Sequence, residues 1–257
     1  MAPQDVLTAL RDKNPLVHCI TNYVAMNIAA NVVLAAGASP AMVHAPEEIA
    51  DFTPICGALT INIGTLSTRW QASMMNAATL ASAHKIPWVL DPVAHSISDY
   101  RKRAAQDLLA LRPTIVRGNA SEILALAGEA GAGKGADAGD SVDAAQGAAK
   151  ALAAASGAVI AITGPVDFVT DGAQEAHLSG GSPLMPQITA LGCSQTALMG
   201  AYAASGPAFN AALGALAHFK VAGTVASKLA HGPGSFQMHF LDALAATQPD
   251  DLAKAIL

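Results

Sequence analysis

Charged residues, aromatic residues and cysteines are all scarce in this chain of 257 residues. Asp, Glu, Lys and Arg together make up 13% of it and aromatic residues 4%, whereas apolar residues reach 52%. With so few charges, most helices must be covered by other parts of the fold, which favours a layered protein or an oligomer. The formal net charge is −5 and no run of basic residues occurs, which argues against binding of nucleic acid.

The three cysteines, Cys19, Cys56 and Cys193, are odd in number and far apart, which argues against a disulfide framework and a structural zinc site. No apolar run reaches the roughly 18 residues of a membrane span. The first residues mix charges into a helical pattern, which differs from the basic-then-apolar order of a signal peptide. We therefore expect a cytoplasmic protein that does not bind a membrane.

Helical and strand-like segments alternate along most of the sequence. Apolar, strand-like runs cover residues 58–63, 86–91, 113–117, 157–163 and 166–170. Helical patterns cover residues 22–37, 68–84, 104–111 and 142–155, and the chain is mostly helical from residue 193. Strands separated by helices predict an α/β protein with a largely parallel central sheet and helices on both faces. Because no repeat and no linker divides the chain, we predict a single domain over residues 1–257.

A Gly/Ala/Asp-rich segment, residues 128–140, contains a partial match to a phosphate-binding P-loop. Gly128, Gly133 and Lys134 have the required spacing, but Gly135 stands where a Ser or Thr would hold magnesium. The residues before the segment have a helical pattern, whereas a P-loop follows a strand. We interpret the segment as a flexible loop.

Polar residues follow the predicted strands, at the edge where a parallel sheet places its ligands. Asp91 and Glu122 follow neighbouring strands, and such hard carboxylates suit Mg²⁺ held through water and phosphate oxygens. Each also has a structural interpretation. Asp91 could cap a helix or turn before Pro92, and Glu122 could form a helix capping box with Asn119. The residue types alone leave both interpretations open.

Arg117 ends a predicted buried strand, where a guanidinium without a partner is costly. A phosphate would be a suitable bidentate partner, and a salt bridge to Asp91 or Glu122 is the alternative. Thr163 and Gly164 end the following strand, where a hydroxyl and an accessible backbone suit a nucleotide. A simple transition from strand to turn is equally compatible with these two residues.

The segment ITALGCSQTALMG, residues 188–200, is typical of a helix N-terminus that holds an anion, because Gly192 leaves room for the backbone and good helix formers follow. Cys193 occupies this position, and a helix N-terminus lowers the pKa of a thiol from its ordinary value near 8.5. Packing at the start of a helix is the alternative for this cysteine. The eight histidines show no metal-binding spacing, and His18 and Cys19 do not make a reactive pair because neighbouring strand residues point to opposite faces.

Six segments are distinctive in combination. In chain order they are HCITNYVAMNIAANVVLAAGASPAMVHAPEE, INIGTL, DPVA, RGNASEI, AITG and TALGCSQTA. Together they closely resemble the hydroxyethylthiazole kinase family of the ribokinase-like superfamily, from about residue 14 to about residue 207. The combination of ITNYV with GASPAM is the most specific part of this resemblance.

The resemblance implies a ribokinase-like fold and transfer of the γ-phosphoryl group of ATP to the hydroxyl of 4-methyl-5-(2-hydroxyethyl)thiazole. It further implies Mg²⁺ as cofactor, a place in thiamine biosynthesis or salvage, and a homotrimer with pockets at subunit interfaces. The residues that it matches to family sites are Met42 and Asn22 for the thiazole, Arg117 and Thr163 for ATP, and Asp91 and Glu122 for magnesium.

The start of the last helical region departs from the family pattern. Where the family often has Gly-Thr-Gly-Cys, this chain has Ala190, Leu191, Gly192 and Cys193. Ala190 occupies a substrate-contacting position, and because alanine is strained at positive φ, we predict an ordinary backbone conformation there. Cys193 stands where most ribokinase-like enzymes have an aspartate. By this resemblance it orients and deprotonates the alcohol, while the Gly192 and Cys193 amides hold the moving phosphoryl group.

Two other functions remain open from the sequence. Another ribokinase-like kinase of small alcohols, such as a hydroxymethylpyrimidine kinase, would share the fold, although the ITNYV and GASPAM segments argue against it. A non-catalytic nucleotide sensor is the second alternative. Retention of Asp91, Glu122 and Cys193 argues against a sensor, because such a protein has no need of the transfer machinery.

Overall fold

The computed structural model describes residues 1–128 and 142–256, and its centre is a sheet of eight strands. The strands are β1 (Leu16–Ile20), β2 (Ser39–Ala41), β3 (Ala58–Asn62), β4 (Trp88–Asp91), β5 (Ile115–Asn119), β6 (Val159–Thr163), β7 (Asp167–Thr170) and β8 (Glu175–Leu178). They are arranged in the order β2-β1-β3-β4-β5-β6-β7-β8. The first six are parallel, and β7 and β8 join antiparallel at one edge. The expectation of a largely parallel α/β sheet is confirmed.

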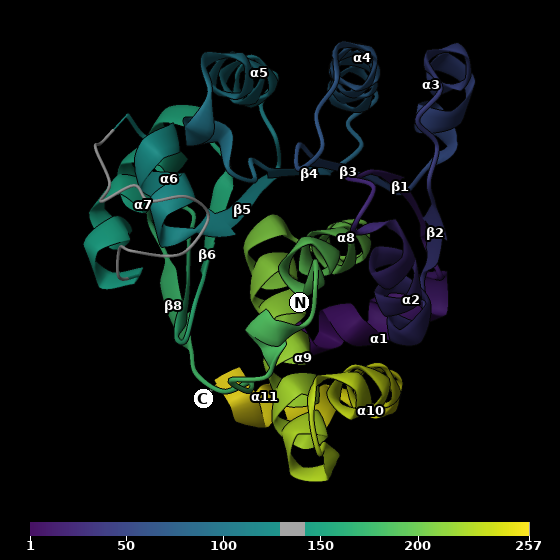
Figure 1. Ribbon diagram of the computed structural model, residues 1–257, viewed down its shortest axis with the longest axis vertical. Coiled ribbons are helices and arrows are strands. Elements are labelled where there is room, and N and C mark those ends of the chain that lie inside the picture. The colour runs from purple at the N-terminus through teal and green to yellow at the C-terminus, as the bar shows by residue number, and fades with distance from the viewer. Residues whose placement is uncertain (129–141, 257) are drawn as a thin grey trace.

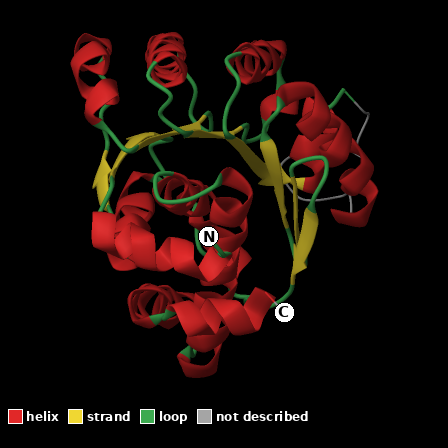
Figure 2. Ribbon diagram, turned by 180° about the vertical axis from the view of Figure 1, so that it is seen from behind, coloured by secondary structure: helices red, strands yellow, loops and turns green. Residues whose placement is uncertain are grey.

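Helices connect the strands and cover both faces of the sheet (Figure 1). They are α1 (Pro3–Lys13), α2 (Met26–Ala36), α3 (Pro46–Phe52), α4 (Thr68–Ala83), α5 (Asp99–Ala110), α6 (Ala120–Leu126), α7 (Val142–Ser156), α8 (Leu191–Ala203), α9 (Ala208–Leu229), α10 (Pro233–Ala246) and α11 (Pro249–Ile256). On one face lie α3 to α7; on the other lie α2, α8 and α9, with α1, α10 and α11 packed beyond them (Figure 2).

Each face of the sheet has its own apolar core. Successive strand residues point to opposite faces, so Val89 of β4 belongs to the core under α8 and α9, whereas the next residue, Leu90, belongs to the core under α4 and α5. Both β3 and β4 are buried along their whole length, as expected for parallel strands covered on two sides. Such strands give nearly continuous apolar runs, which is why the sequence predicted them well.

Two predicted helices begin elsewhere in the structure. The helix predicted from residue 22 begins at Met26, because Asn22 Oδ1 accepts a hydrogen bond from the Ala25 amide and holds residues 22–25 in a turn. The helix predicted over residues 104–111 begins at Asp99, where the Ser98 hydroxyl caps the Arg101 amide. The P-loop match and the flexible-loop interpretation cover residues 128–140, all of which except Gly128 lie outside the described part of the chain. No helix within the described ranges is long and apolar enough to cross a membrane.

Candidate active site

The carboxyl ends of the parallel strands carry the polar residues of the site. Asn62 and Asp91 are paired at the ends of β3 and β4, and Asn119 and Thr163 are paired at the ends of β5 and β6. In parallel sheets, ligands bind at this edge of the strands. The strand ends that the sequence predicted to meet at one edge of the sheet do so in the structure.

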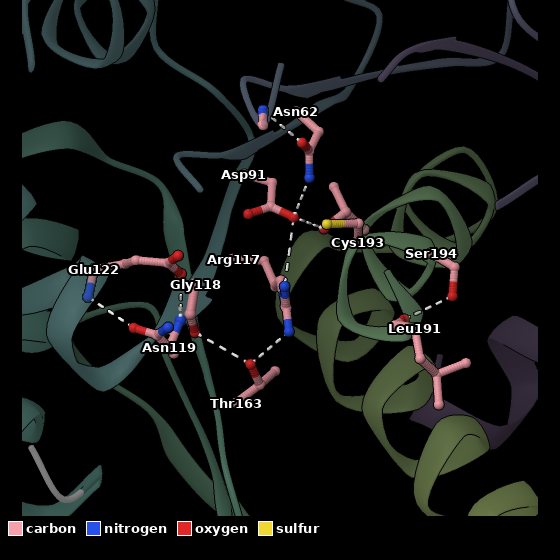
Figure 3. A network of polar contacts seen from close by, with 12 residues as sticks. Asn62, Asp91, Arg117, Gly118, Asn119, Glu122, Thr163, Leu191, Cys193 and Ser194 are labelled. Atoms are coloured by element: carbon pink, nitrogen blue, oxygen red, sulfur yellow. Dashed lines mark hydrogen bonds and ion pairs between the residues drawn. The ribbon is translucent and has the colours of Figure 1, made fainter. Parts of the chain in front are cut away.

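A continuous line of hydrogen bonds runs along this edge (Figure 3). It begins with Asn22 Nδ2, which donates to Asn62 Oδ1 at 2.8 Å, and Asn62 Nδ2 donates to Asp91 Oδ2 at 2.7 Å. Arg117 continues the line: Nη1 lies 3.4 Å from Asp91 Oδ2, and Nη2 donates to Thr163 Oγ1 at 2.6 Å. Five residues from five strand ends are thus connected.

Asp91 is fully buried, and its two oxygens have different surroundings. Oδ2 accepts hydrogen bonds from Asn62 and from the Thr196 hydroxyl, the latter at 2.7 Å, and forms the ion pair with Arg117. Oδ1 is buried and has no hydrogen-bond partner among the described residues. Burial raises the pKa of Asp91 to about 6, while the charge of Arg117 acts in the opposite direction. An oriented carboxylate oxygen without a partner is the feature expected of a cation ligand.

Glu122 forms the capping box that was its structural alternative. Its Oε2 accepts from the Asn119 amide at 2.8 Å, and Asn119 Oδ1 accepts from the Glu122 amide at 2.9 Å. Its Oε1 accepts from the Ala94 amide at 3.1 Å, which ties the loop after β4 to α6. Each carboxylate oxygen keeps a free lone pair, so the capping box and a role toward magnesium are compatible.

Asp91 and Glu122 fit a magnesium site in which the phosphate oxygens of the substrate supply part of the coordination. Mg²⁺ is commonly held by one or two carboxylates, with phosphate oxygens and water completing the octahedron. Asp91 supplies an oxygen without a partner, and Glu122 lies at the next strand end. No group of three or more His, Cys, Asp or Glu side chains gathers as a metal site in the part of the chain that the structure describes, so phosphate oxygens and water would have to complete the coordination.

Helix α8 begins between the two halves of the site, and its start corrects one prediction. Ala190, which precedes it, has φ 59° and ψ 15°, a left-handed conformation. The prediction of an ordinary conformation was wrong, because the chain must reverse here: the Leu191 amide bonds to Ile188 O, and the Ser194 amide to Ala190 O. The position has the backbone shape that glycine adopts easily, with an alanine in it.

Gly192 allows the Arg117 side chain to lie against the N-terminus of α8. A Cβ added at Gly192 would be 3.1 Å from Arg117 Nη2, closer than ordinary van der Waals contact. The free amides of the first helical turn and the guanidinium therefore converge on one place. An anion there would meet both hydrogen-bond donors and positive charge.

Cys193, in the first turn of α8, is joined to this line through Asn22. Asn22 Nδ2 lies 3.4 Å from its sulfur. Burial raises the pKa of the Cys193 thiol to about 11, and the negative charge of Asp91 acts in the same direction. The expectation of a lowered pKa is wrong, because desolvation and a nearby carboxylate outweigh the lowering effects of Arg117, Asn62 and Asn22. The thiol is protonated at neutral pH.

A cavity of about 700 Å³ opens beside Arg117 and Thr163. The residues that line it and that sequence reasoning missed include Asp167, Gly180, Gly181, Met185, Gln195, Phe219 and Lys220. Lys220 had a detectable signal, since it is the single lysine within an apolar stretch of α9, AALGALAHFKVAG. The others had no signal that distinguished them from core or loop residues, and they reach the cavity from a hairpin, a loop and two helices.

Met42 and Ala190 lie outside the polar line. Met42 directly follows β2, at the opposite end of the sheet from β6, and both residues are partly buried against the core beneath α8. Asn22 follows the neighbouring strand β1. Met42 and Asn22 therefore lie on the β1–β2 side and the candidate ATP residues on the β5–β6 side, with α8 and the preceding Ala190 between them (Figure 1).

The class of protein comes first from the fold. A ribokinase-like superfamily protein from Enterococcus faecalis, 12% identical in sequence, superimposes with a TM-score of 0.68 over 96% of this chain and 95% of its own. The chain thus has the ribokinase-like fold.

Closer comparisons identify the family. The model of the hydroxyethylthiazole kinase family matches residues 7–250, and the chain belongs to this family. A hydroxyethylthiazole kinase from Roseobacter denitrificans is 81% identical over 256 residues, which is 100% of both chains. The structure of a Pyrococcus horikoshii hydroxyethylthiazole kinase protein is 35% identical and has a TM-score of 0.90, covering 98% of this chain and 95% of that one.

Proposed function

We propose that this protein transfers the γ-phosphoryl group of ATP to the hydroxyl of 4-methyl-5-(2-hydroxyethyl)thiazole, as a cytoplasmic enzyme of thiamine biosynthesis or salvage. The observation that carries the proposal is the hydrogen-bonded line from Asn22 to Thr163, which passes the mouth of α8 and ends at a cavity of about 700 Å³. Membership in the hydroxyethylthiazole kinase family supports the choice of substrate.

The cavity side of the site binds ATP in this proposal. Arg117 and Thr163 contact phosphate oxygens, and the guanidinium, already held by Asp91 and Thr163, presents its remaining donors to the cavity. The amides of Gly192 and Cys193 stabilise the charge on the phosphoryl group during transfer. These groups act by position and charge, which is the main requirement of a loose phosphoryl-transfer transition state.

Asp91 and Glu122 are the residues that would hold Mg²⁺. A bound Mg²⁺ supplies charge neutralisation and orientation of the phosphate oxygens. Asp91 offers its buried, unpartnered Oδ1, while Asn62, Thr196 and Arg117 fix the carboxylate through Oδ2. Glu122 is fixed by the capping box and by the Ala94 amide.

The alcohol binds on the β1–β2 side. Met42 contacts the thiazole ring with a polarizable thioether, Asn22 lies near the same pocket, and the Ala190 backbone faces the substrate. Cys193 orients the hydroxyl and takes its proton. Because the thiol is protonated at rest, only its minor thiolate form can take the proton of the alcohol, so orientation is the larger part of its role and the proton moves late in the transfer.

The assembly proposed is a homotrimer of single-domain subunits of 257 residues, with substrate pockets at the subunit interfaces. Tyr23 and Val24 directly follow Asn22 and are exposed in one protomer, 66% and 57% respectively. Apolar side chains so exposed beside a substrate residue are typical of a surface that a second subunit covers.

Release of ADP in a coupled assay tests the function directly. We expect turnover with the hydroxyethylthiazole and Mg²⁺, and none when the metal is chelated. Hydroxymethylpyrimidine, tested in parallel as the acceptor alcohol, distinguishes the proposed enzyme from a hydroxymethylpyrimidine kinase of the same fold. Tight ATP binding without turnover of either alcohol would contradict the proposal and would support the alternative function, a non-catalytic nucleotide sensor.

A further inference from the structure

Lys220 lies in the middle of α9 and is 6% exposed; it is the one buried lysine among the residues whose exposure the structure gives. An ammonium group is strongly destabilised in such a place unless it is paired and hydrogen-bonded. The residue borders the cavity to which the proposed function assigns ATP. Its contacts therefore need an explanation that the polar line from Asn22 to Thr163 does not provide.

The three N–H bonds of Lys220 are directed at one turn. Nζ donates to Gly164 O at 2.7 Å and to Pro165 O at 3.0 Å, and it lies 3.3 Å from Asp167 Oδ1. Asp167 Oδ1 also accepts from the Gly164 amide at 2.9 Å. Lysine and aspartate together thus hold both the carbonyl and the amide of Gly164. Because all three donors are in use, Lys220 has none left for a phosphate in this arrangement.

The stem of Lys220 contacts a second wall of the cavity. A Cβ added at Gly180 would be 3.6 Å from Lys220 Cβ, and one added at Gly181 would be 3.4 Å from Lys220 Cδ. Gly180 and Gly181 have φ values of 116° and 86°, so the segment after β8 crosses the lysine stem in a conformation that favours glycine. One side chain therefore joins the turn after β6 to the segment after β8.

Resting on the proposed function, we propose that Lys220 is a positioning residue for the nucleotide, which acts by holding the Gly164–Pro165 turn and, through it, Thr163. Thr163 Oγ1 accepts from Arg117 Nη2 at 2.6 Å, so a displaced turn also releases one of the two groups that fix the Arg117 guanidinium. Asp167 is the ion-pair partner of the ammonium in the buried turn.

Lys220→Met tests the proposal because it keeps the apolar stem and removes the three donors. We expect the displaced turn to raise KM for ATP about tenfold, which corresponds to about 1.4 kcal/mol. We expect KM for the thiazole to change less than about twofold, because β2 and β6 are five strand spacings of about 4.8 Å apart. Lys228→Met, which removes an exposed lysine of the same helix, is the matched control.

The double variant Lys220→Met/Asp167→Asn separates positioning from stability. Lys220→Met alone leaves the buried Asp167 carboxylate without its cation. The double variant has no charge at either position of this pair, and its Asn oxygen still accepts from the Gly164 amide. We expect the double variant to regain most of the Tm lost in Lys220→Met while its KM for ATP stays high. A double variant that regains both Tm and the wild-type KM would show that the pair is only structural, and would overturn the proposal.

Failure of the function and failure of this inference give different results. If the wild-type protein phosphorylates no alcohol, the proposed function fails, and the affinity for a non-hydrolysable ATP analogue replaces KM as the readout for Lys220. An unchanged KM or affinity in folded Lys220→Met, with or without turnover, overturns the positioning role. A raised KM for ATP in Lys228→Met of the same size would also count against it.

Discussion

Cys193 lies in the first turn of α8, where a helix dipole favours a thiolate, yet burial and the charge of Asp91 act in the opposite direction and raise the pKa of the thiol to about 11. The sulfur is 3.4 Å from Nδ2 of Asn22, which is one of the candidate thiazole residues. A neutral thiol in this place is suited to orienting a hydroxyl. Only the thiolate, the minor form at neutral pH, can accept the proton, and it does so as the alcohol becomes acidic during phosphoryl transfer.

Substitution of Cys193 measures this role. We expect Cys193→Ala to lower kcat by about ten- to a hundredfold with little change in KM for either substrate, because an aligned proton acceptor contributes mainly to the chemical step. Cys193→Asp should retain or exceed the wild-type rate, since a carboxylate is ionised at neutral pH. Cys56→Ala is the control, because Cys56 precedes β3 and lies at the amino ends of the strands, away from the site. An alanine variant as fast as the wild type would eliminate the base role.

Met42 follows β2 and is partly buried against the core beneath α8, which agrees with both a packing role and a substrate role. We expect Met42→Ala to raise KM for the thiazole by about five- to tenfold, since a buried side-chain contact of this size is worth about 1 kcal/mol or more. KM for ATP should stay within about twofold of the wild-type value. Met75→Ala, on α4 across the sheet, controls for loss of a partly buried methionine. Equal effects on both substrates would mean that Met42 only packs.

At the scale of elements, the start of α8 carries backbone strain. Ala190 has φ 59°, and a left-handed conformation costs a non-glycine residue about 1–2 kcal/mol. Glycine would remove this strain but would gain entropy in the unfolded chain. We expect Ala190→Gly to raise the free energy of unfolding by up to about 1 kcal/mol, measured by urea denaturation. Gly147→Ala, within α7 and with open space around its Cβ position, should also stabilise and calibrates the method. A less stable Ala190→Gly variant would show that the alanine side chain contributes packing that outweighs the strain.

Elements differ in how far the sequence predicts them. The fully buried strands β3 and β4 were predicted from their apolar runs, whereas β8 (EAHL) was missed because an edge strand with alternating exposure has no such run. The start of α5 was missed because its first turn, DYRKR, is polar and the signal is the Ser98 cap. Helix starts that depend on caps are thus harder to predict than buried strands.

Candidate residues show the same division. Asp91, Arg117 and Thr163 were found because strand ends converge in any parallel sheet, so topology alone places them. The pKa of Cys193 and the φ of Ala190 were predicted wrongly, because both depend on neighbours that only the folded chain supplies. Lys220 was missed because its partners lie 53 to 56 residues away, in a turn whose carbonyls carry no sequence signal.

At the scale of the whole molecule, a buried histidine joins three helices on the α9 side of the sheet. His218 Nε2 donates to Leu244 O of α10 at 2.8 Å, since a carbonyl only accepts, and this leaves Nδ1 to accept from the Tyr202 hydroxyl of α8 at 3.0 Å. The arrangement requires a neutral imidazole. Burial lowers the pKa of His218 from 6.5 to about 4 in the folded protein.

The stability of the protein should therefore fall in acid. Between pH 6.5 and about 4 the unfolded chain binds a proton at residue 218 and the folded protein does not, so the contribution of His218 is complete above pH 6.5 and is lost as the pH falls toward 4. The difference of about 2.5 pKa units amounts to on the order of 3 kcal/mol at pH 4. Urea denaturation at several pH values should give a shallower dependence for His218→Gln than for the wild type. His84→Gln, an exposed histidine after α4, should keep the wild-type slope. If the slope of His218→Gln equals that of the wild type, the acid sensitivity originates elsewhere, and the neutral imidazole is not what makes the packing of α8, α9 and α10 sensitive to pH.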